Sequence, residues 1–379
     1  MKTVGFVTLV RDVVPVLVLL YMGFLEYSFC YEFCYRTVER RSISISLIGI
    51  YNVLLCAVLG TWIWVFVEGP GCMGVRVPPY DLDASYRRGR GVVEVEKEED
   101  GEAADGELEN PHDHRPSCSP PPQSHPISPT CLPTSPSPPP TIPPPSIFLC
   151  NSQGLPAYCT ACQTLKVLRS HHTSSCSRCV PTMDHYCLFL GSAIGQNNYR
   201  DFIAFIVSVD CLLLLSVVAI LCYIKKHLHP AIIVGLSVNI WLFLMVSNLI
   251  GSSLSMIRYN ETTIERLAKR DLRRRLRKRK NTDVEVLTTY VNVRHPTLEG
   301  IRLVVPLSVK DCPYDKGTFA ANFKERMTRC RFCNVEEIME YEKKQFGADF
   351  KRKVYERIAH EQGPVRVFGE ALLPAGTTA

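Results

Sequence analysis

Four long apolar runs restrict the folds open to this chain more than any other feature of its sequence. A helix needs roughly 20 apolar residues to cross the hydrocarbon core of a bilayer. The runs cover residues 13–31, 43–66, 202–224 and 231–257. One such run could be a buried helix of a large soluble protein, but four in 379 residues indicate an all-α membrane protein. Its helix pairs are predicted over residues 1–70 and 202–258, and the ionisable Glu26 is expected to face the bundle interior.

Charge predicts the orientation of these helices. Residues 269–280, directly after the fourth run, include nine lysines and arginines, which the positive-inside rule places in the cytosol. An even number of spans then puts both termini and the segment between spans two and three on the same cytosolic side. Arg36, Arg40, Arg41, Lys225 and Lys226 fall on the opposite side but are outnumbered. We therefore expect an integral multi-pass membrane protein with a cytosolic C-terminal region over residues 259–379, without assigning an organelle.

The segment between spans two and three changes composition abruptly. An acidic block at residues 96–100 leads into a Pro/Ser-rich tract that ends at residue 146. Such a stretch cannot bury enough apolar surface to fold, so residues 71–150 are predicted to be a largely disordered cytosolic linker. Beyond it, residues 151–201 form a small cysteine-rich domain. The chain has 17 cysteines and no recognisable cleavable signal peptide, which favours reduced thiols used for metal binding or catalysis over disulfides.

Four metal-binding residue types occur at ligand spacing in this domain. Cys159-x2-Cys162, followed by His172 and Cys179, supplies three thiolates and one imidazole, a closed tetrahedral set for structural zinc. The alternative is a group of unligated core thiols. The domain has little apolar mass of its own, so metal binding would supply much of its folding free energy. We predict one zinc ion at these four residues.

A candidate nucleophile follows in Asp184-His185-Tyr186-Cys187. A thiol with a nearby histidine and carboxylate is the minimum set for nucleophilic catalysis. His185 is close enough to take the Cys187 proton, and Asp184 could orient the imidazole. The alternative for His185 is an ordinary hydrogen-bonded surface histidine. A nucleophile at a bilayer surface suggests a lipid or a lipidated carrier as one substrate.

An ordered series of motifs surrounds this nucleophile. The series reads Tyr158-Cys159-x2-Cys162, Lys166-x2-Arg169-Ser170-His171-His172, Cys176-x2-Cys179, Asp184-His185-Tyr186-Cys187 and Gly195-x2-Asn198-Tyr199-x2-Phe202. It resembles the cysteine-rich domain of the Asp-His-His-Cys (DHHC) protein S-acyltransferases, or palmitoyltransferases, and most of all the fungal branch whose signature reads Asp-His-Tyr-Cys. Flanking motifs also resemble the family's, namely Glu68-Gly69-Pro70-Gly71, Thr262-Thr263-Ile264-Glu265 and the stretch from Pro313 to Asn322.

The resemblance implies an activity and its partners. Cys187 would attack an acyl-CoA such as palmitoyl-CoA, and the resulting S-acyl enzyme would pass its acyl group to cysteines of membrane-associated, cytosol-facing proteins by ping-pong kinetics. Lys166, Arg169 and His171 are candidate contacts for the CoA phosphates, although ordinary solvated charge is the alternative. Phe189 would lie near the acyl chain. Nucleic acid is not an expected partner.

Departures from the family pattern concern a second zinc site. The resemblance places its ligands at Thr173, Cys176, Tyr186 and Ala193, and three of the four ligands are missing, so this site is predicted to be empty. Because of this loss, a non-catalytic zinc-stabilised membrane scaffold stays open as the alternative function. Retention of Asp184, His185 and Cys187 favours the enzyme. Thr262-x2-Glu265 also reads as a helix capping box.

Overall fold

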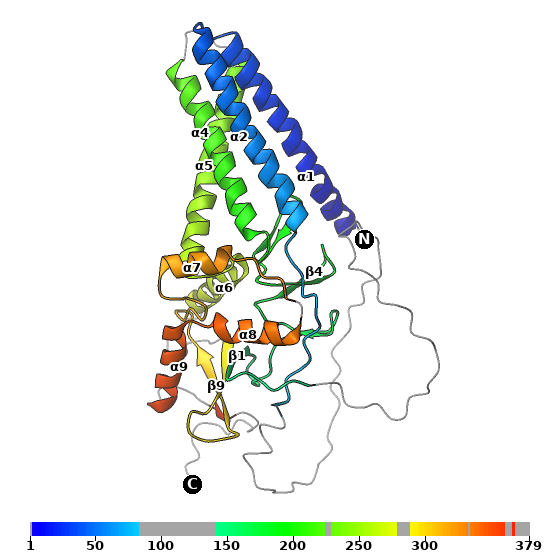
Figure 1. Cartoon of the computed structure of the whole chain (residues 1–379), viewed down its shortest axis with the longest axis vertical. Helices are drawn as coiled ribbons and strands as arrows, with labels where there is room; N and C mark the ends of the chain where they lie inside the picture. The colour runs from blue at the N-terminus through cyan, green and yellow to red at the C-terminus, as the bar shows by residue number, and fades with distance from the viewer. Residues whose placement is uncertain are drawn as a thin grey trace, which may run out of the picture.

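The membrane-spanning helices form an elongated bundle with the remaining elements gathered at one end (Figure 1). In this computed structural model the chain is described over residues 2–82, 141–223, 229–278, 289–332, 334–360 and 366–367. The N-terminus lies at the same end of the bundle as the extramembrane elements. This arrangement agrees with an even number of spans.

Within the described residues, four helices are long and apolar enough to cross a membrane, as predicted. The first is α1 (Lys2–Glu26), which continues as the π-helix η1 (Tyr27–Tyr35). The others are α2 (Arg41–Glu68), α4 (Tyr199–Cys222) and α5 (Pro230–Arg258). Helix α4 packs against both α2 and α5 and contributes residues to two apolar clusters in the bundle. The predicted membrane architecture is therefore confirmed.

The expectation for Glu26 is wrong. Glu26 is exposed, whereas Glu32, six residues further along in the π-helix, is buried. Glu32 has partners that make burial possible, because the Tyr27 hydroxyl and the Arg36 guanidinium both donate to its carboxylate. A buried carboxylate is stable only when such donors are present, and Glu32 lies within reach of them.

A four-stranded antiparallel sheet lies outside the bundle and was not predicted. It has the order β1-β8-β9-β10, from β1 (Ile147–Cys150), β8 (Thr289–Arg294), β9 (Arg302–Leu307) and β10 (Arg366–Val367). Strand β1 comes from the predicted linker and pairs with β8, more than a hundred residues later, with Phe148 opposite Asn292. Four helices accompany the sheet: α6 (Thr263–Lys278), α7 (Phe319–Met327), α8 (Val335–Gln345) and α9 (Ala348–Ala359).

The predicted linker boundaries differ from the structure at both ends. Tyr80 forms a bridge with Ile142, and Val77 is fully buried in a cluster with Phe148 and Val304. Residues 71–82 and 141–150 are thus folded against the sheet and the cysteine-rich domain. The Pro/Ser-rich centre of the linker, residues 83–140, lies outside the described residues.

The cysteine-rich domain consists of three short hairpins. They pair β2 (Tyr158–Cys159) with β3 (Thr164–Leu165), β4 (His171–Thr173) with β5 (Arg178–Val180), and β6 (His185–Cys187) with β7 (Ser192–Ile194). Each hairpin carries residues of a predicted site. The hairpins therefore set the geometry of both the candidate metal cluster and Cys187.

Candidate active site and metal cluster

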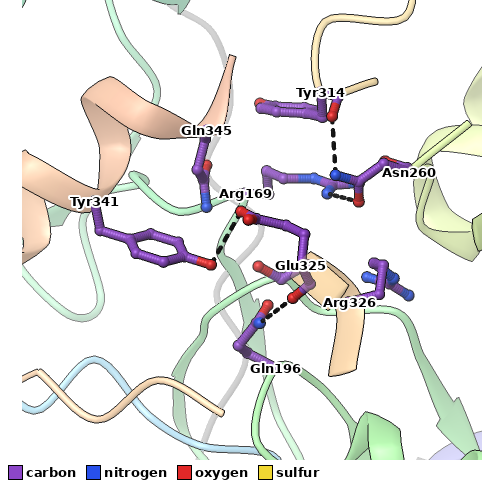
Figure 2. A pocket seen from close by; sticks show the side chains of 9 residues that line it. Arg169, Gln196, Asn260, Tyr314, Glu325, Arg326, Tyr341 and Gln345 are labelled. Carbon is purple, nitrogen blue, oxygen red and sulfur yellow. Dashed lines mark hydrogen bonds between the residues drawn. The ribbon is translucent and has the colours of Figure 1, made fainter. Parts of the chain in front are cut away.

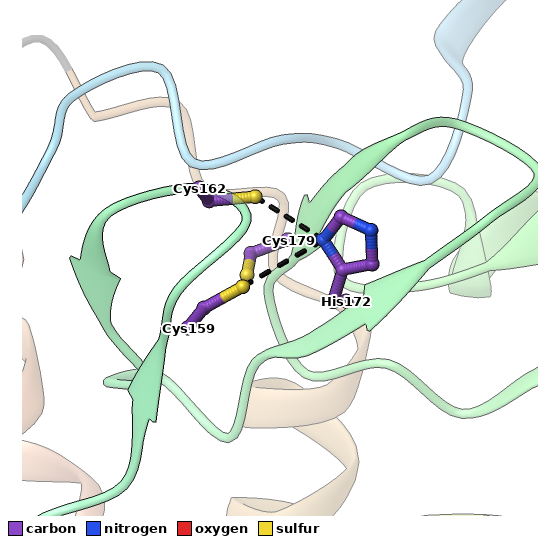
Figure 3. A group of neighbouring side chains, drawn as sticks. All are labelled: Cys159, Cys162, His172 and Cys179. Atoms are coloured by element: carbon purple, nitrogen blue, oxygen red, sulfur yellow. Dashed lines mark hydrogen bonds between the residues drawn. The ribbon is translucent and has the colours of Figure 1, made fainter. Parts of the chain in front are cut away.

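The four predicted zinc ligands come together between the first two hairpins (Figure 3). Cys159 ends β2 and Cys162 lies in the following turn, while His172 and Cys179 are directly paired across β4 and β5. All four donor atoms lie within 4.8 Å of one another. The His172 Nδ1 atom is 3.2 Å from the Cys162 Sγ atom and 3.7 Å from the Cys159 Sγ atom.

These residues fit a tetrahedral metal ion. Zn–S bonds of about 2.3 Å and Zn–N bonds of about 2.0 Å require donor atoms about 3.6 Å apart, which the histidine–cysteine distances match. Cys159 and Cys179 are buried, as in a closed structural site. A metal here would tie the β2–β3 hairpin to the β4–β5 hairpin, and it would have no open position for chemistry.

The positions of the second family site provide a different environment. Tyr186 and Ala193 face each other across β6 and β7, and Ala193 is buried. The Thr173 hydroxyl lies 2.9 Å from the Ser175 hydroxyl, which in turn lies 3.8 Å from the Cys176 thiol. Cys176 is the one member of the four with a side chain that zinc commonly uses. Among the described residues, the Cys159 group is the one cluster of side chains placed to hold a metal ion.

The Asp-His-Tyr-Cys segment places its functional side chains by strand geometry. Residues two apart on a strand share a face, so His185 and Cys187 lie on one side of β6 and Tyr186 on the other. The His185 Nδ1 atom donates to the Asp184 Oδ2 atom over 2.9 Å, which leaves the other ring nitrogen for the thiol. Burial would lower the pKa of His185, but hydrogen bonds to Asp184 and Cys187 outweigh it and raise that pKa to about 9.

Asp184 is a buried carboxylate, only 1% exposed, that accepts hydrogen bonds from three residues. Besides His185, it accepts from the Thr263 backbone N–H (3.1 Å) and hydroxyl (2.7 Å) and from the Arg326 guanidinium (2.8 Å). Burial alone would raise the pKa of Asp184, but the His185 hydrogen bond and the Arg326 charge hold it well below its usual range. Asp184 is therefore an ionised acceptor that fixes the imidazole.

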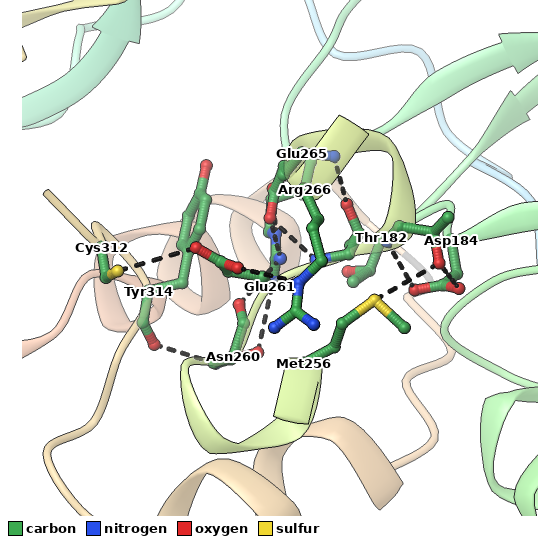
Figure 4. Close-up of polar contacts among 12 residues, drawn as sticks. Thr182, Asp184, Met256, Asn260, Glu261, Glu265, Arg266, Cys312 and Tyr314 are labelled. Carbon is green, nitrogen blue, oxygen red and sulfur yellow. Dashed lines mark hydrogen bonds and ion pairs between the residues drawn. The ribbon is translucent and has the colours of Figure 1, made fainter. Parts of the chain in front are cut away.

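Thr263 belongs to the Thr-Thr-x-Glu motif, and Figure 4 shows this region beside Asp184. The motif starts α6 as the predicted capping box. The Thr262 backbone N–H donates to the Glu265 carboxylate over 3.0 Å, and the Glu265 N–H donates to the Thr262 hydroxyl over 3.2 Å. The cap fixes the first turn of α6, and Thr263 in that turn reaches Asp184.

Arg169 lies inside the protein rather than at a surface that CoA could reach. Its side chain is 4% exposed and is paired with the Glu265 carboxylate. It also donates to the side-chain and backbone oxygens of Asn260 and stacks 4.2 Å from the centre of the Tyr314 ring. Every donor group of the guanidinium thus has a protein partner. The expectation that Arg169 contacts CoA phosphate is corrected to a structural role.

The other predicted contacts lie nearer the surface. Lys166 and His171 are half-buried, and Phe189 is 54% exposed in the turn between β6 and β7. Leu190, in the same turn, is fully buried in an apolar cluster with Trp62, Phe202 and other residues of the spanning helices, and Cys187 packs against this cluster. Cys187 therefore lies where the β6–β7 hairpin meets the membrane bundle.

Arg326, which contacts Asp184, was not predicted from the sequence. It lies on α7, one turn after Asn322, the residue at which the recognised C-terminal motif ends. Residues four apart share one face of a helix. A basic residue four positions after Asn322 was therefore the sequence signal that could have pointed to Arg326. Nothing local connects it to Asp184, which is 142 positions away.

Comparison with known proteins agrees with this geometry. Residues 152–270 match the family model described as DHHC palmitoyltransferase. Palmitoyltransferase PFA5 of Saccharomyces cerevisiae is 26% identical over 67% of this chain and 62% of its own length. That of Candida glabrata is 28% identical over 70% and 63%, and that of Eremothecium gossypii is 38% identical over 33% and 37%. The chain spans less than two thirds of the length of these relatives. Residues 152–270 thus carry a domain of the DHHC palmitoyltransferase family, and the chain is similar to the fungal PFA5 palmitoyltransferases.

Proposed function

We propose that this chain is a protein S-acyltransferase that moves palmitoyl or similar acyl groups from acyl-CoA to cysteines of membrane-associated proteins. The observation that carries the proposal is the Asp184–His185 hydrogen bond on the strand that also carries Cys187, at the end of an apolar helix bundle. A thiol activated in this way can exchange thioesters. The relatives' name, palmitoyltransferase, supports the same chemistry.

The first half-reaction loads the enzyme. His185 accepts the Cys187 proton, and the thiolate attacks the carbonyl carbon of the acyl-CoA thioester. The bond between that carbon and the CoA sulfur breaks, and the CoA sulfur leaves with the proton that His185 held. The products are S-acyl-Cys187 and free CoA. Asp184 stabilises the imidazolium throughout, as the third member of a triad does.

The second half-reaction reverses the roles. A cysteine thiol of the substrate protein gives its proton to His185 and attacks the acyl carbonyl. The bond to the Cys187 sulfur breaks, and Cys187 recovers a proton from His185. No external energy source is needed, because one thioester replaces another. The two halves share one site, so the kinetics are ping-pong.

The surroundings of Cys187 support an acyl chain as the group it carries. Cys187 packs against the apolar cluster of the bundle, and exposed Leu188 and Phe189 follow it. Burial of each acyl CH₂ contributes about 0.8 kcal/mol, so a chain entering the bundle would be held strongly. Lys166 and His171 are the proposed contacts for the CoA phosphates. Zinc at Cys159, Cys162, His172 and Cys179 would supply structural support and no chemical step.

The proposed orientation has the site and both termini in the cytosol. The basic residues of α6, which begins five residues after α5 ends, support this side under the positive-inside rule. Acyl-CoA and cytosol-facing substrate proteins would both reach the site from there. A non-catalytic scaffold would share the fold and the metal cluster, so only chemistry separates the two functions.

The test is acyl transfer from labelled palmitoyl-CoA to detergent-purified protein. We expect wild type and Cys176→Ser to take up label that hydroxylamine releases, and Cys187→Ser to take up none. Cys176 is the matched control, since it is a half-buried cysteine of the same domain outside the metal cluster. No label in folded, metal-loaded wild type favours the scaffold. Equal label in all three means that another cysteine is acylated.

A further inference from the structure

The buried carboxylate of Asp184 raises the question of its counter-charge. An ionised carboxylate removed from water is costly unless it is paired and hydrogen-bonded. Thr263 supplies two neutral donors, which satisfy lone pairs without balancing charge. The remaining partners are His185 and Arg326, and His185 must exchange its proton with Cys187 during the proposed reaction. Arg326 is thus the permanent cation of this site.

We propose that Arg326, on the C-terminal helix α7, is a positioning residue that keeps Asp184 ionised and aimed at His185, so that ionisation of Cys187 depends on α7. The inference rests on the proposed acyltransferase function. Both side chains of the Arg326–Asp184 pair are 2% exposed, and the bond is 2.8 Å long. A charge-assisted hydrogen bond with this geometry is stronger than a neutral one.

The position of Arg326 is set by two other elements. Its guanidinium carbon lies 3.8 Å from the centre of the Tyr199 ring at the start of α4, a cation–π arrangement. One turn earlier on α7, the Asn322 side chain donates to the backbone oxygen of Arg258 at the end of α5. These contacts hold α7 against the ends of two spanning helices. Arg326 therefore has little freedom to follow Asp184 or to leave it.

Arg326 also lies at the wall of a small pocket between the cysteine-rich domain and the C-terminal region (Figure 2). In this pocket Gln196 donates to the backbone oxygens of Glu325 and Thr328, on either side of Arg326. The Tyr341 hydroxyl from α8 donates to the Glu325 carboxylate over 3.1 Å. The segment around Arg326 is thus fixed to both the cysteine-rich domain and α8.

The other charges near the triad do not replace Arg326. Arg169 is engaged by Glu265, and that pair has no net charge. Tyr199 presents its aromatic ring to Arg326 and carries no positive charge. Cys187 supplies the proton that His185 accepts, so it is not a cation either. Thr263 and the rest of the α6 cap add neutral donors only. Without Arg326, the cation that stays hydrogen-bonded to Asp184 among the described residues is His185 in its protonated form.

Loss of the Arg326 charge should oppose thiolate formation by two routes that act in the same direction. Asp184 would lose the donor that holds its carboxylate in place, so it would be aimed less firmly at His185 and would stabilise the imidazolium less well. The site would also lose a nearby positive charge, which disfavours an anion directly. Both routes move the reactivity of Cys187 to higher pH. A purely structural ion pair would change stability without this movement.

The experiment follows alkylation of Cys187 by iodoacetamide as a function of pH, read by mass spectrometry of the Cys187 peptide. It uses the full purified chain as wild type, Arg326→Gln, Arg326→Lys and the surface control Arg352→Gln, since Arg352 is exposed on α9. We expect Arg326→Gln to raise the pH at which alkylation of Cys187 is half-maximal by about one unit. At pH values below that midpoint, alkylation should be about tenfold slower than in wild type. Arg326→Lys keeps the positive charge, so its alkylation profile should return most of the way to that of wild type. Arg352→Gln should match wild type.

Two results would overturn the inference. One is a folded Arg326→Gln protein whose alkylation profile is unchanged. The other is failure of both Arg326 variants to fold, which would make Arg326 a structural residue only. Because alkylation needs no acyl-CoA, its outcome is separate from that of the proposed function. A wild type that alkylates normally but never forms an acyl-enzyme would contradict the acyltransferase while leaving the Arg326 result to stand.

Discussion

At the scale of single residues, charge pairing separates the side chains that do chemistry from those that hold the fold. His185 and Arg169 are both basic residues next to acidic partners. His185 donates to Asp184 and shares a face of β6 with Cys187, so in the proposed reaction it faces the reacting atom. Arg169 is enclosed by Glu265, Asn260 and Tyr314, and no part of it is left for a ligand.

The first prediction concerns the pH dependence of stability through His185. Its folded pKa of about 9 is above the ordinary value of about 6.5. The imidazolium therefore stabilises the fold fully below about pH 6.5, and this contribution is lost as pH rises toward about 9. Thermal unfolding of wild type and His185→Gln in detergent should differ most at low pH and converge at high pH. A difference that grows with pH would contradict this placement of the charge.

The second prediction compares Arg169 with Lys166. Arg169→Gln leaves the Glu265 carboxylate without its cation, and we expect a loss of about 2–4 kcal/mol in unfolding free energy. The KM for acyl-CoA should stay near the wild-type value for the folded fraction. Lys166→Gln should do the opposite, with a raised KM and little change in thermal unfolding. A raised KM in a stable Arg169→Gln protein would restore Arg169 to the CoA site.

At the scale of elements, the β6–β7 hairpin joins the cysteine-rich domain to the membrane bundle. Its turn places Leu190 in the apolar cluster of the spanning helices, and a side chain at Gly191 would come within 3.2 Å of Pro15 on α1. Gly191 has a φ of +68°, a conformation that glycine adopts without strain. The hairpin thereby keeps Cys187 at the end of the bundle while Leu188 and Phe189 stay exposed.

Truncation of this contact gives the third prediction. Leu190→Ala removes a fully buried side chain, and we expect a cost of about 2–4 kcal/mol from lost burial and the cavity left behind. Acyl-enzyme formation should also slow, because the hairpin that carries Cys187 loses its anchor. Leu188→Ala is the matched control, since Leu188 is 38% exposed, and it should change stability by less than about 0.5 kcal/mol. Equal effects of the two substitutions would mean that Leu190 is not the anchor.

At the scale of the whole molecule, contacts between distant segments decide what the sequence can predict. The four spans, the capping box, the metal ligands and the Asp184–His185–Cys187 order depend on residues within a few tens of positions, and each was predicted. The β1–β8 pairing, the Arg169–Asn260 contact 91 positions apart and the Arg326–Asp184 pair depend on tertiary packing. No local pattern distinguishes Arg169 or Arg326 from a solvated basic residue, so these roles required the structure.

The fourth prediction concerns the metal as a support for the whole extramembrane part. Purified protein should contain about one zinc per chain, and a strong chelator should lower its thermal stability and stop acyl-enzyme formation together. Cys162→Ala should have the same effect as the chelator, whereas Cys176→Ala should keep metal and stability. Two zinc ions per chain, or a chelated protein with full stability, would contradict the single structural site.

The central claim is that Cys187 carries the acyl group between two half-reactions. The measurement is mass spectrometry of wild-type protein mixed with palmitoyl-CoA alone and then with a cysteine-containing acceptor peptide. We predict a thioester-linked acyl group on the Cys187 peptide after the first addition and its transfer to the acceptor after the second. An acyl group on a different cysteine, or acceptor acylation with Cys187 never modified, would contradict the account.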